Sequence, residues 1–350
     1  MKRTVVLAAS LLALLAATAP ATAHARTPYG QGLDHCAPVA GSTALACHLD
    51  LPPGTYDVTV TLGGATAGAT AISGESRRAL LAETPTRAGE RLRRSFTVDV
   101  RDPEGEPTGP AGSPGLDLLL GGAAPSVESL RVTPAPRATR LLLIGDSTVC
   151  DQPGDPYAGW GQRLPAHLKR GVAVANHADS GESTVTFLSN PALFDRVEAA
   201  IRPGDPVLIQ LAHNDKQTDA AGYRANLTTL VERVRARGGE PALVTPIVRR
   251  WFSADGTLDN DIALLVNGLG VDHPAEIRSL AATLATPLID LTALTRARVE
   301  QLGPEASKAL YLTAEKRDNT HTSLQGATEY AALVAAELKA QRLLPERAFR

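Results

Sequence analysis

The sequence predicts an α/β protein in which a doubly wound parallel sheet follows a small antiparallel β-sandwich. Two patterns along the 350 residues support this prediction. From about 27 to 135, apolar residues alternate with polar ones, which is typical of half-buried strands. After Pro134-Ala135-Pro136, short continuous apolar runs alternate with helical patterns, which is typical of a parallel sheet covered on both faces.

The first 25 residues, 1–25, have the pattern of a secretory signal peptide. Lys2 and Arg3 precede an apolar stretch over 5–17, and small residues follow at 21–25. The apolar stretch is shorter than the roughly 18 residues that a membrane span needs, and no other run reaches that length. We therefore expect a secreted protein without a membrane span, and the remaining length favours two domains.

Residues 27–135 form the predicted β-sandwich domain. The segments 56–62 and 95–100 each place every second residue on an apolar face. Pro52-Pro53-Gly54 and a Pro/Gly-rich stretch over 102–115 are typical of turns, and no helical period is visible. This pattern indicates a small antiparallel β-sandwich.

Residues 138–345 form the predicted second domain. The Pro134-Ala135-Pro136 segment before it indicates a connection that few contacts cross. Continuous apolar strands separated by helices predict a doubly wound parallel sheet. The expected strands are 141–144, 172–175, 207–211, 242–244 and 288–291, and the expected helices are 159–170, 191–202, 222–237, 274–285 and 323–341.

Charge and cysteine content narrow the classes of function. The formal net charge is -2 and the basic residues are scattered, so no nucleic-acid surface is expected. Cys36 and Cys47 could form a disulfide in an exported protein or remain two small buried thiols, while Cys150 has no obvious partner. The sequence contains no zinc-type spacing of Cys and His, so we expect no metal site.

A serine follows the first predicted strand of the second domain. In doubly wound sheets, ligands bind outside the carboxyl ends of the strands. Gly145-Asp146-Ser147-Thr148 begins at such an end, where a following helix would offer free backbone N–H groups to an oxyanion. Ser147 is therefore a candidate nucleophile, although an ordinary helix cap gives the same local pattern.

Two further polar clusters are expected at the same edge of the sheet. Gly181 comes after the second predicted strand and lets the backbone approach a ligand closely. Asn214 comes after the third and can offer a side-chain amide donor. Both are candidate oxyanion donors together with the Ser147 N–H, although turn formation is the simpler explanation for each taken singly.

A candidate base and its partner lie near the end of the chain. Asp318 and His321 are three residues apart in a short polar segment, close enough for the carboxylate to accept the imidazole N–H. A serine nucleophile needs such a base, and the base needs a group that fixes its tautomer. By itself, such a pair is common by chance, and a surface histidine is the simpler explanation.

The order of these residues distinguishes between families of serine hydrolases. The sequence contains no G-x-S-x-G, so it lacks the nucleophile elbow of the α/β-hydrolases. The blocks at Ser147, Gly181, Asn214 and the pair Asp318 and His321 resemble those of the SGNH (GDSL-like) hydrolases. Gly-Asp-Ser-Thr, His-Asn-Asp and Asp-x-Thr-His are similar to the rhamnogalacturonan acetylesterase branch, carbohydrate esterase family 12, including bacterial members with a β domain in front.

The resemblance implies a flavodoxin-like three-layer α/β/α sandwich. It also implies a secreted serine esterase that removes acetyl groups from an acetylated pectic polysaccharide or oligosaccharide without a metal or cofactor. The implied catalytic residues are Ser147, Asp318 and His321, and the implied oxyanion hole consists of Ser147, Gly181 and Asn214.

Two departures and two alternatives accompany this resemblance. Glu182 stands where the branch often has Arg, which concerns substrate contacts, and Ala212 stands where it often has Gly, which concerns backbone freedom. A general short-chain esterase or lipase is the first alternative, but only 4% of the residues are aromatic and no lipid-binding amphipathic segment is evident. A non-catalytic carbohydrate-binding protein is the alternative from another class.

Overall fold

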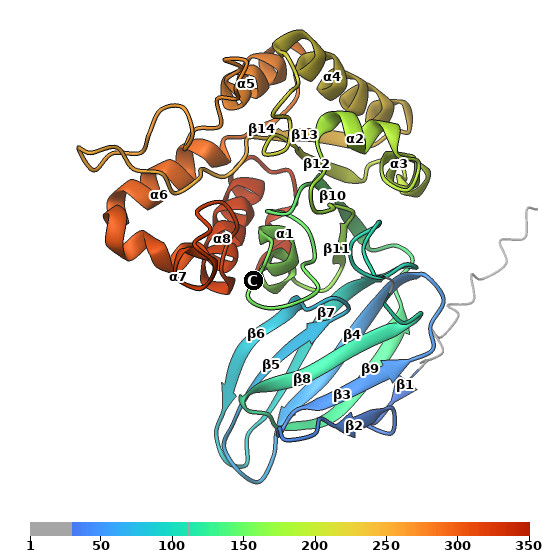
Figure 1. Cartoon of the computed structure of the whole chain (residues 1–350). Coiled ribbons are helices and arrows are strands. Elements are labelled where there is room, and N and C mark those ends of the chain that lie inside the picture. Colours follow the sequence, from blue (N-terminus) through green and yellow to red (C-terminus); the bar gives the residue numbers. More distant parts are fainter. Residues whose placement is uncertain (1–29, 111) are drawn as a thin grey trace, which may run out of the picture.

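The molecule consists of a sandwich of two antiparallel sheets beside a parallel sheet that is flanked by helices (Figure 1). The computed structural model describes residues 30–110 and 112–350, and the predicted signal peptide at 1–25 lies outside these residues. The antiparallel sheets precede the five-stranded parallel sheet in the chain. The predicted fold class is therefore confirmed.

The β region, residues 30–134, contains nine strands within its described part. One sheet has the order β1-β9-β4-β7 and the other β2-β3-β8-β5-β6. The strands predicted at 56–62 and 95–100 are β4 and β7, which pair antiparallel. Their alternate apolar side chains help to fill the space between the two sheets. The bounds are β1 Gly30–Gln31, β2 Cys36–Pro38, β3 Leu45–Leu49, β4 Gly54–Gly63, β5 Gly68–Gly74, β6 Arg78–Thr86, β7 Arg91–Val100, β8 Leu116–Ala124 and β9 Val127–Pro134.

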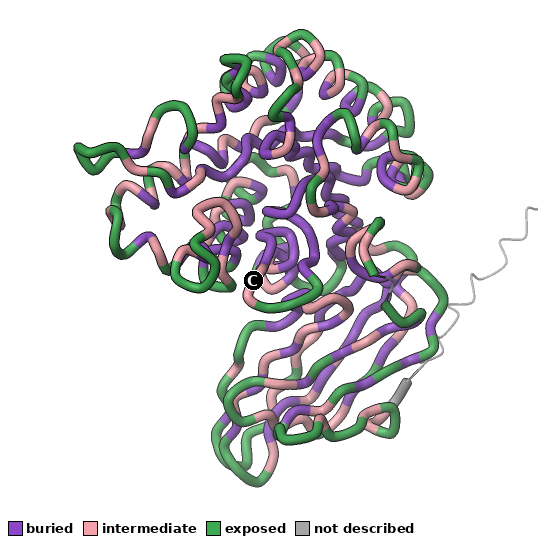
Figure 2. Tube along the Cα trace, in the orientation of Figure 1, coloured by how far each residue is buried: buried purple, intermediate pink, exposed green. Residues whose placement is uncertain are grey.

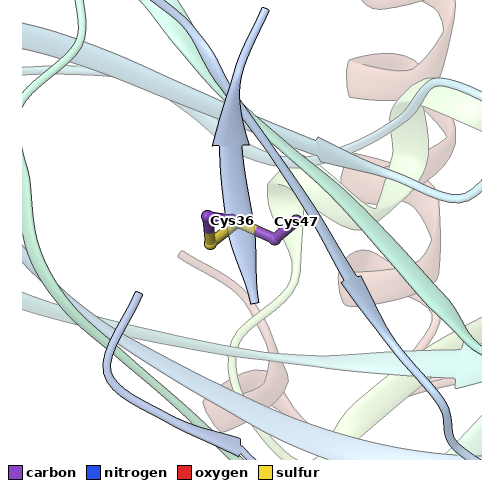
Figure 3. Close-up of a disulfide and its surroundings, with 2 residues drawn as sticks. All are labelled: Cys36 and Cys47. Atoms are coloured by element: carbon purple, nitrogen blue, oxygen red, sulfur yellow. A yellow bond between two sulfur atoms is a disulfide. The ribbon is translucent and has the colours of Figure 1, made fainter. Parts of the chain in front are cut away.

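The two cysteines near the start of the β region form a disulfide (Figure 3). Cys36 lies on β2 and Cys47 on β3, directly opposite each other in the register of the pair. The bond joins β2, at the edge of its sheet, to the neighbouring strand, and a bond of this kind typically stabilises a fold by about 2–4 kcal/mol. The pairing that the sequence leaves open is thus present, and Cys150 is a buried free thiol.

The parallel sheet has the strand order β11-β10-β12-β13-β14. Counted within the sheet, this is the 2-1-3-4-5 order of flavodoxin-like folds. Every residue of β11 and β12 is buried, because helices cover both faces, and this explains the continuous apolar runs in the sequence. The bounds are β10 Thr139–Gly145, β11 Val172–Asn176, β12 Pro206–Gln210, β13 Glu240–Val244 and β14 Leu288–Ile289.

Helices on the two faces of the parallel sheet complete three layers. Leu141 and Leu143 of β10 enter the core formed with α1, α6 and α8. Leu142 and Ile144 enter the opposite core, formed with α2, α3, α4 and α5. Figure 2 shows the buried strands at the centre and the exposed residues on the outer turns. The bounds are α1 Trp160–Arg163, α2 Thr184–Ser189, α3 Phe194–Ala200, α4 Ala220–Ala236, α5 His273–Thr283, α6 Leu291–Ala306, α7 Thr313–Lys316 and α8 Leu324–Ala340.

Capping residues set the start of three helices that the sequence predicts. The helices expected at 222–237, 274–285 and 323–341 are α4, α5 and α8, while the one expected at 191–202 is the shorter α3. Before each of the first three, a side-chain oxygen accepts a hydrogen bond from a backbone N–H three residues on, which satisfies one of the free N–H groups at the helix start. These caps are Asp219, Asp272 and Ser323.

Three parts of the α/β region differ from the prediction. The helix expected at 159–170 becomes the 3-10 helix Leu164–His167 after α1, because Pro165 has no N–H to donate. The strand expected at 288–291 ends at Ile289, since Asp290 caps the unexpected helix α6. The sequence also does not predict α2 and α7, which have only six and four residues.

A buried ion pair joins the β region to the α/β region. Arg78 Nε of β6 donates to Asp151 Oδ2 at 2.6 Å, and the two side chains are 1% and 0% exposed. Asn176 Nδ2 donates to the other Asp151 oxygen at 2.8 Å, and Arg78 Nη1 donates to Asp99 O at 2.9 Å. The expectation that few contacts cross the Pro134-Ala135-Pro136 connection is therefore wrong, because the two regions share a desolvated charge pair.

We expect Asp151→Asn to lower the free energy of unfolding by about 3–5 kcal/mol, because the buried Arg78 charge would lose its partner. Urea unfolding followed by circular dichroism measures this change. Glu128→Gln removes the exposed ion pair with Arg91 and is the matched control, which should leave the unfolding curve nearly unchanged. A loss below about 1 kcal/mol in Asp151→Asn would show that the pair does not hold the regions together.

Glu75, in the turn before β6, should make stability depend on pH. Burial raises its pKa from 4.5 to about 8, against the opposing charge of Arg78. Between these two values the folded state holds a proton that the unfolded chain has lost, so the free energy of unfolding falls as the pH rises. We expect Glu75→Gln to remove this fall when melting temperatures are compared at about pH 5 and pH 8. Parallel pH profiles for the variant and the parent protein would contradict the assignment.

Candidate active site

Ser147, His321 and Asp318 form a continuous line of hydrogen bonds. Ser147 Oγ and His321 Nε2 are 2.9 Å apart, and His321 Nδ1 and Asp318 Oδ2 are 2.6 Å apart. An ionised carboxylate only accepts hydrogen bonds, so Nδ1 carries the proton and Nε2 presents its lone pair to the serine hydroxyl. The structure thus brings together the three residues that the sequence proposes as nucleophile, base and orienting carboxylate.

The turn after β10 fixes the backbone of Ser147. A Cβ atom at Gly145 would lie 2.5 Å from Cγ2 of Val149, so only glycine fits where the strand ends. Val149 N donates to Asp146 O at 2.9 Å, which closes the turn. Gln152 Nε2 donates to Ser147 O at 2.8 Å. Hydrogen bonds to the carbonyl before the serine and to the carbonyl of the serine itself therefore fix the backbone at this position.

Asp318 is oriented by backbone donors in the loop between α7 and α8. Its Oδ1 accepts hydrogen bonds from the N–H groups of Thr320 at 2.8 Å and His321 at 3.0 Å, which leaves Oδ2 for the imidazole. Burial opposes ionisation, but these donors and the imidazole outweigh it and lower the pKa of Asp318 below its ordinary value. The residue therefore acts on His321 as a charged acceptor.

The loop after Ser147 also contacts the histidine end of the line. The ring of Tyr157 stands edge-on to the imidazole of His321, with centroids 5.4 Å apart and planes at 82°. Thr322 Oγ1 donates to Ala158 O at 2.5 Å, and Ala158 N donates to Thr322 O at 3.3 Å. One loop thus fixes the distance between the candidate nucleophile and the candidate base.

The three candidate oxyanion donors lie on neighbouring loops. Gly181 has φ +83° with open space around the position of a Cβ. Within the described residues, neither the Ser147 nor the Gly181 backbone N–H donates a hydrogen bond. Asn214 Nδ2 donates to Glu182 O at 3.1 Å, which ties the loop after β12 to the loop after β11. Gln152 Nε2 contacts both Ser147 O, at 2.8 Å, and Ser180 Oγ, at 3.4 Å, so the serine turn adjoins the Gly181 loop.

The two departures from the family pattern leave this arrangement intact. Asn214 bonds the backbone carbonyl of Glu182, and that contact does not depend on the side chain at this position. Burial raises the pKa of the Glu182 carboxyl. Ala212 is 2% exposed and does not have a positive φ, so glycine is not required there. Both replacements therefore change the surroundings of the donors rather than their backbone.

Asp146 is a functional candidate in addition to the five residues that the sequence predicts. It is fully buried beside Ser147, and Thr148 donates to its Oδ1 from the backbone at 2.9 Å and from the hydroxyl at 2.7 Å. Its Oδ2 accepts a hydrogen bond from His213 Nδ1 at 3.1 Å. Burial opposes its ionisation, but His213 and Thr148 lower its pKa. The available signal is an acidic residue between a buried strand and the candidate nucleophile.

Two arginines after β13 connect the loops around the site. Arg249 Nη2 donates to His213 O at 3.1 Å. Arg250 N donates to Asn319 O at 2.7 Å, and its Nη1 donates to Asn319 Oδ1 at 3.2 Å. The residue after His213 is Asn214 and the residue before Asn319 is Asp318, so this pair links the donor side of the site to its base side.

A cavity of about 260 Å³ opens beside the segment that carries Asn214. Its walls include the polar side chains Lys216, Gln217, Arg249 and Asn267 as well as His213. His213 also contacts Asp146, so the cavity adjoins the nucleophile turn. Ala212, Leu265 and Val266 also line it, so the lining is mixed and includes two cationic side chains.

Two kinds of feature are absent from residues 30–110 and 112–350. No helix there has the length and apolar character needed to cross a membrane. No group of three or more His, Cys, Asp and Glu side chains there could hold a metal ion.

The flavodoxin-like sheet, the serine at the end of its first strand and the Asp–His pair before the last helix define a class of ester hydrolase. Residues 143–328 match the GDSL-like lipase/acylhydrolase family. The match covers more than half of the chain, and the chain belongs to this family. It is therefore a carboxylic ester hydrolase.

Two relatives from Bacillus subtilis extend the comparison. The chain is 35% identical over 212 residues to rhamnogalacturonan acetylesterase RhgT, and this match covers 56% of this chain and 88% of RhgT. It is 28% identical over 303 residues to the uncharacterized esterase YxiM, and this match covers 84% of this chain and 74% of YxiM. The crystal structure of YxiM superposes with a TM-score of 0.53, covering 88% of this chain and 83% of that one. The likeness to YxiM thus extends over both the β region and the α/β region.

Proposed function

We propose that this chain is a secreted serine esterase that removes O-acetyl groups from a plant cell-wall polysaccharide, with acetylated rhamnogalacturonan or pectin as the substrate class. The observation that carries the proposal is the hydrogen-bonded line from Ser147 through His321 to Asp318, with distances of 2.9 and 2.6 Å. This line supplies a nucleophile, a base and a group that fixes the tautomer of the base.

The proposed reaction proceeds through an acetyl-enzyme. Ser147 Oγ attacks the acetyl carbonyl carbon while its proton passes to His321 Nε2, and the carbonyl electrons move to oxygen. The C–O bond to the sugar then breaks, and His321 returns the proton to the departing sugar oxygen. Water attacks the acetyl carbon of Ser147 with His321 again as the base, which releases acetate and restores the serine. Asp318 stabilises the imidazolium in both steps.

Three N–H donors would hold the oxyanion in this reaction: the backbone groups of Ser147 and Gly181 and the side-chain amide of Asn214. The first two have no partner within the described residues, which leaves them available to a ligand. The tie between Asn214 and Glu182 O holds the amide near Gly181. Losing one such donor typically slows turnover by about 100- to 1,000-fold.

The substrate class rests on the named relative and on two cationic side chains that line the cavity beside Asn214. RhgT, which shares 35% identity, is named a rhamnogalacturonan acetylesterase. Lys216 and Arg249 contribute positive charge to the cavity beside Asn214. A polymer with carboxylate groups, such as pectin, is attracted by these cations, whereas a neutral acyl chain is not.

Export is proposed on two observations. Residues 1–25 combine a basic start, an apolar stretch and small residues, as secretory signal peptides do. The Cys36–Cys47 disulfide fits an oxidising compartment, since disulfides persist there and are rare in the cytosol.

We expect acetate release from acetylated pectin to exceed release from acetylated xylan, acetylated chitin oligomers and an aryl acetate by at least about tenfold in kcat/KM. Ser147→Ala should fold with an unchanged melting temperature yet lose activity on every substrate, because the nucleophile is gone. A serine-directed organophosphorus reagent should label Ser147 only. Full activity of Ser147→Ala, or labelling of another serine, would overturn the mechanism, and a preference for xylan would overturn the substrate class alone.

We expect Asp318→Asn to lower kcat by about 100- to 10,000-fold with little change in KM, because the amide no longer fixes the imidazole tautomer. Steady-state kinetics on an aryl acetate measures both constants. Asp261→Asn makes the same chemical change at an exposed position and should behave like the parent protein. A variant that loses only affinity would show that Asp318 contacts the substrate rather than the base.

A further inference from the structure

The loop between β7 and β8 reaches from the β region to the candidate active site. It is the Pro/Gly-rich stretch over 102–115, and residue 111 is outside the described residues. Thr108 donates to both carboxylate oxygens of Asp179, from its backbone N–H at 2.6 Å and from its hydroxyl at 3.0 Å. Asp179 lies two residues before Gly181, so one residue of the β region fixes the start of the loop that carries Gly181.

Glu106 makes the second contact between this loop and the site. Its Oε1 accepts hydrogen bonds from the hydroxyl of Ser180 and, at 2.7 Å, from the thiol of Cys150. Burial raises the pKa of Cys150 well above its ordinary value, so the thiol keeps its proton and acts as the donor. Cys150 lies three residues after Ser147, and its Sγ is 3.7 Å from Ser147 O. Glu106 therefore joins the serine turn to the Gly181 loop.

The Gly181 loop has few other attachments, among them the 3.4 Å contacts of Ser180 Oγ with Gln152 Nε2 and Cys150 Sγ. Asp179 N donates to Gly145 O at 3.0 Å, and Glu182 O accepts from Asn214 Nδ2 at 3.1 Å. Between these points lies Gly181, which is exposed, has a positive φ and has nothing packed around the position of a Cβ. Glycine loses more conformational freedom on ordering than any other residue, so a loop built on it needs contacts that restrict its neighbours.

We propose that Thr108 and Glu106 of the β region are positioning residues for the loop that carries the oxyanion donor Gly181. The β region would then contribute to the geometry of the active site as well as to stability. Each acts through a residue next to the donor: Thr108 through Asp179 and Glu106 through Ser180. The proposal rests on the proposed function, because it assigns to Gly181 the role of an oxyanion donor. Neither residue needs to contact the substrate, so their effect extends to substrates too small to reach the β region.

The test uses two variants that remove the proposed contacts. Thr108→Val removes the hydroxyl with little change of shape, and Glu106→Leu removes the carboxylate. Thr108→Ser and Thr84→Val are the controls. The hydroxyl of Thr84 donates to the nearby Ala82 O in the same strand, far from the Gly181 loop in the chain. With an aryl acetate as substrate, we expect kcat to fall about tenfold in Thr108→Val and more in Glu106→Leu, with KM changed less than about twofold. Thr108→Ser restores the hydroxyl and should recover most of the rate.

Hydrogen exchange of the backbone amides gives a readout that does not depend on turnover. We expect the peptide covering 178–183 to exchange faster in Thr108→Val and Glu106→Leu, while peptides from the sheet of the α/β region keep their rates. Unchanged exchange and unchanged kcat in both variants, with an active parent enzyme, would overturn the proposal and leave the proposed function standing. A parent enzyme inactive on every ester, with Ser147 unlabelled by the organophosphorus reagent, would overturn the proposed function itself.

Discussion

The buried carboxylate of Asp146 is the constraint on which the rest of the site depends. A charge that is 0% exposed is tolerated only when its oxygens are fully hydrogen-bonded. Thr148 and His213 supply those bonds, and they come from the turn after β10 and the loop after β12. Ser147 lies between Asp146 and Thr148, and Asn214 follows His213. A single desolvated charge therefore sets the positions of the nucleophile and of one candidate donor at the same time.

The loop after Ser147 is held from the side of the β region. Arg77 Nη1 donates to Gln152 O at 3.2 Å and to Tyr157 O at 3.1 Å. The neighbouring Arg78 pairs with Asp151 of the same loop. Tyr157 stands edge-on to the imidazole of His321. Arg77, just before β6, and Arg78, its first residue, therefore hold the loop whose tyrosine packs against the candidate base.

The sequence is sufficient to predict which loops meet, because every strand of a parallel sheet ends at the same edge and Ser147, Gly181 and Asn214 each follow a buried run. It also predicts the Asp318–His321 contact, which is local. The contacts of 102–115 are not predictable in this way, since a Pro/Gly-rich stretch has no period and its partners are chosen by the docking of two regions. Helix α6 is missed for a different reason. Ile289 and Leu291, on either side of Asp290, are both apolar, so the strand pattern continues past the residue that caps the helix.

Not every relative has room for a counterpart of the β region. RhgT is matched over 88% of its length by only 212 residues of this chain, so it has little chain left for a counterpart of residues 30–134. In the present chain, however, Asp151 and Asp179 each have their carboxylate satisfied by a residue of the β region. Removing that region would take the partner from two carboxylates that are buried in this structure, on the two loops that carry the candidate oxyanion donors. Because Asp151 and Asp179 lie on these two loops, we expect separation of the β region from the hydrolase region to lower stability and to loosen the loops that carry Ser147 and Gly181.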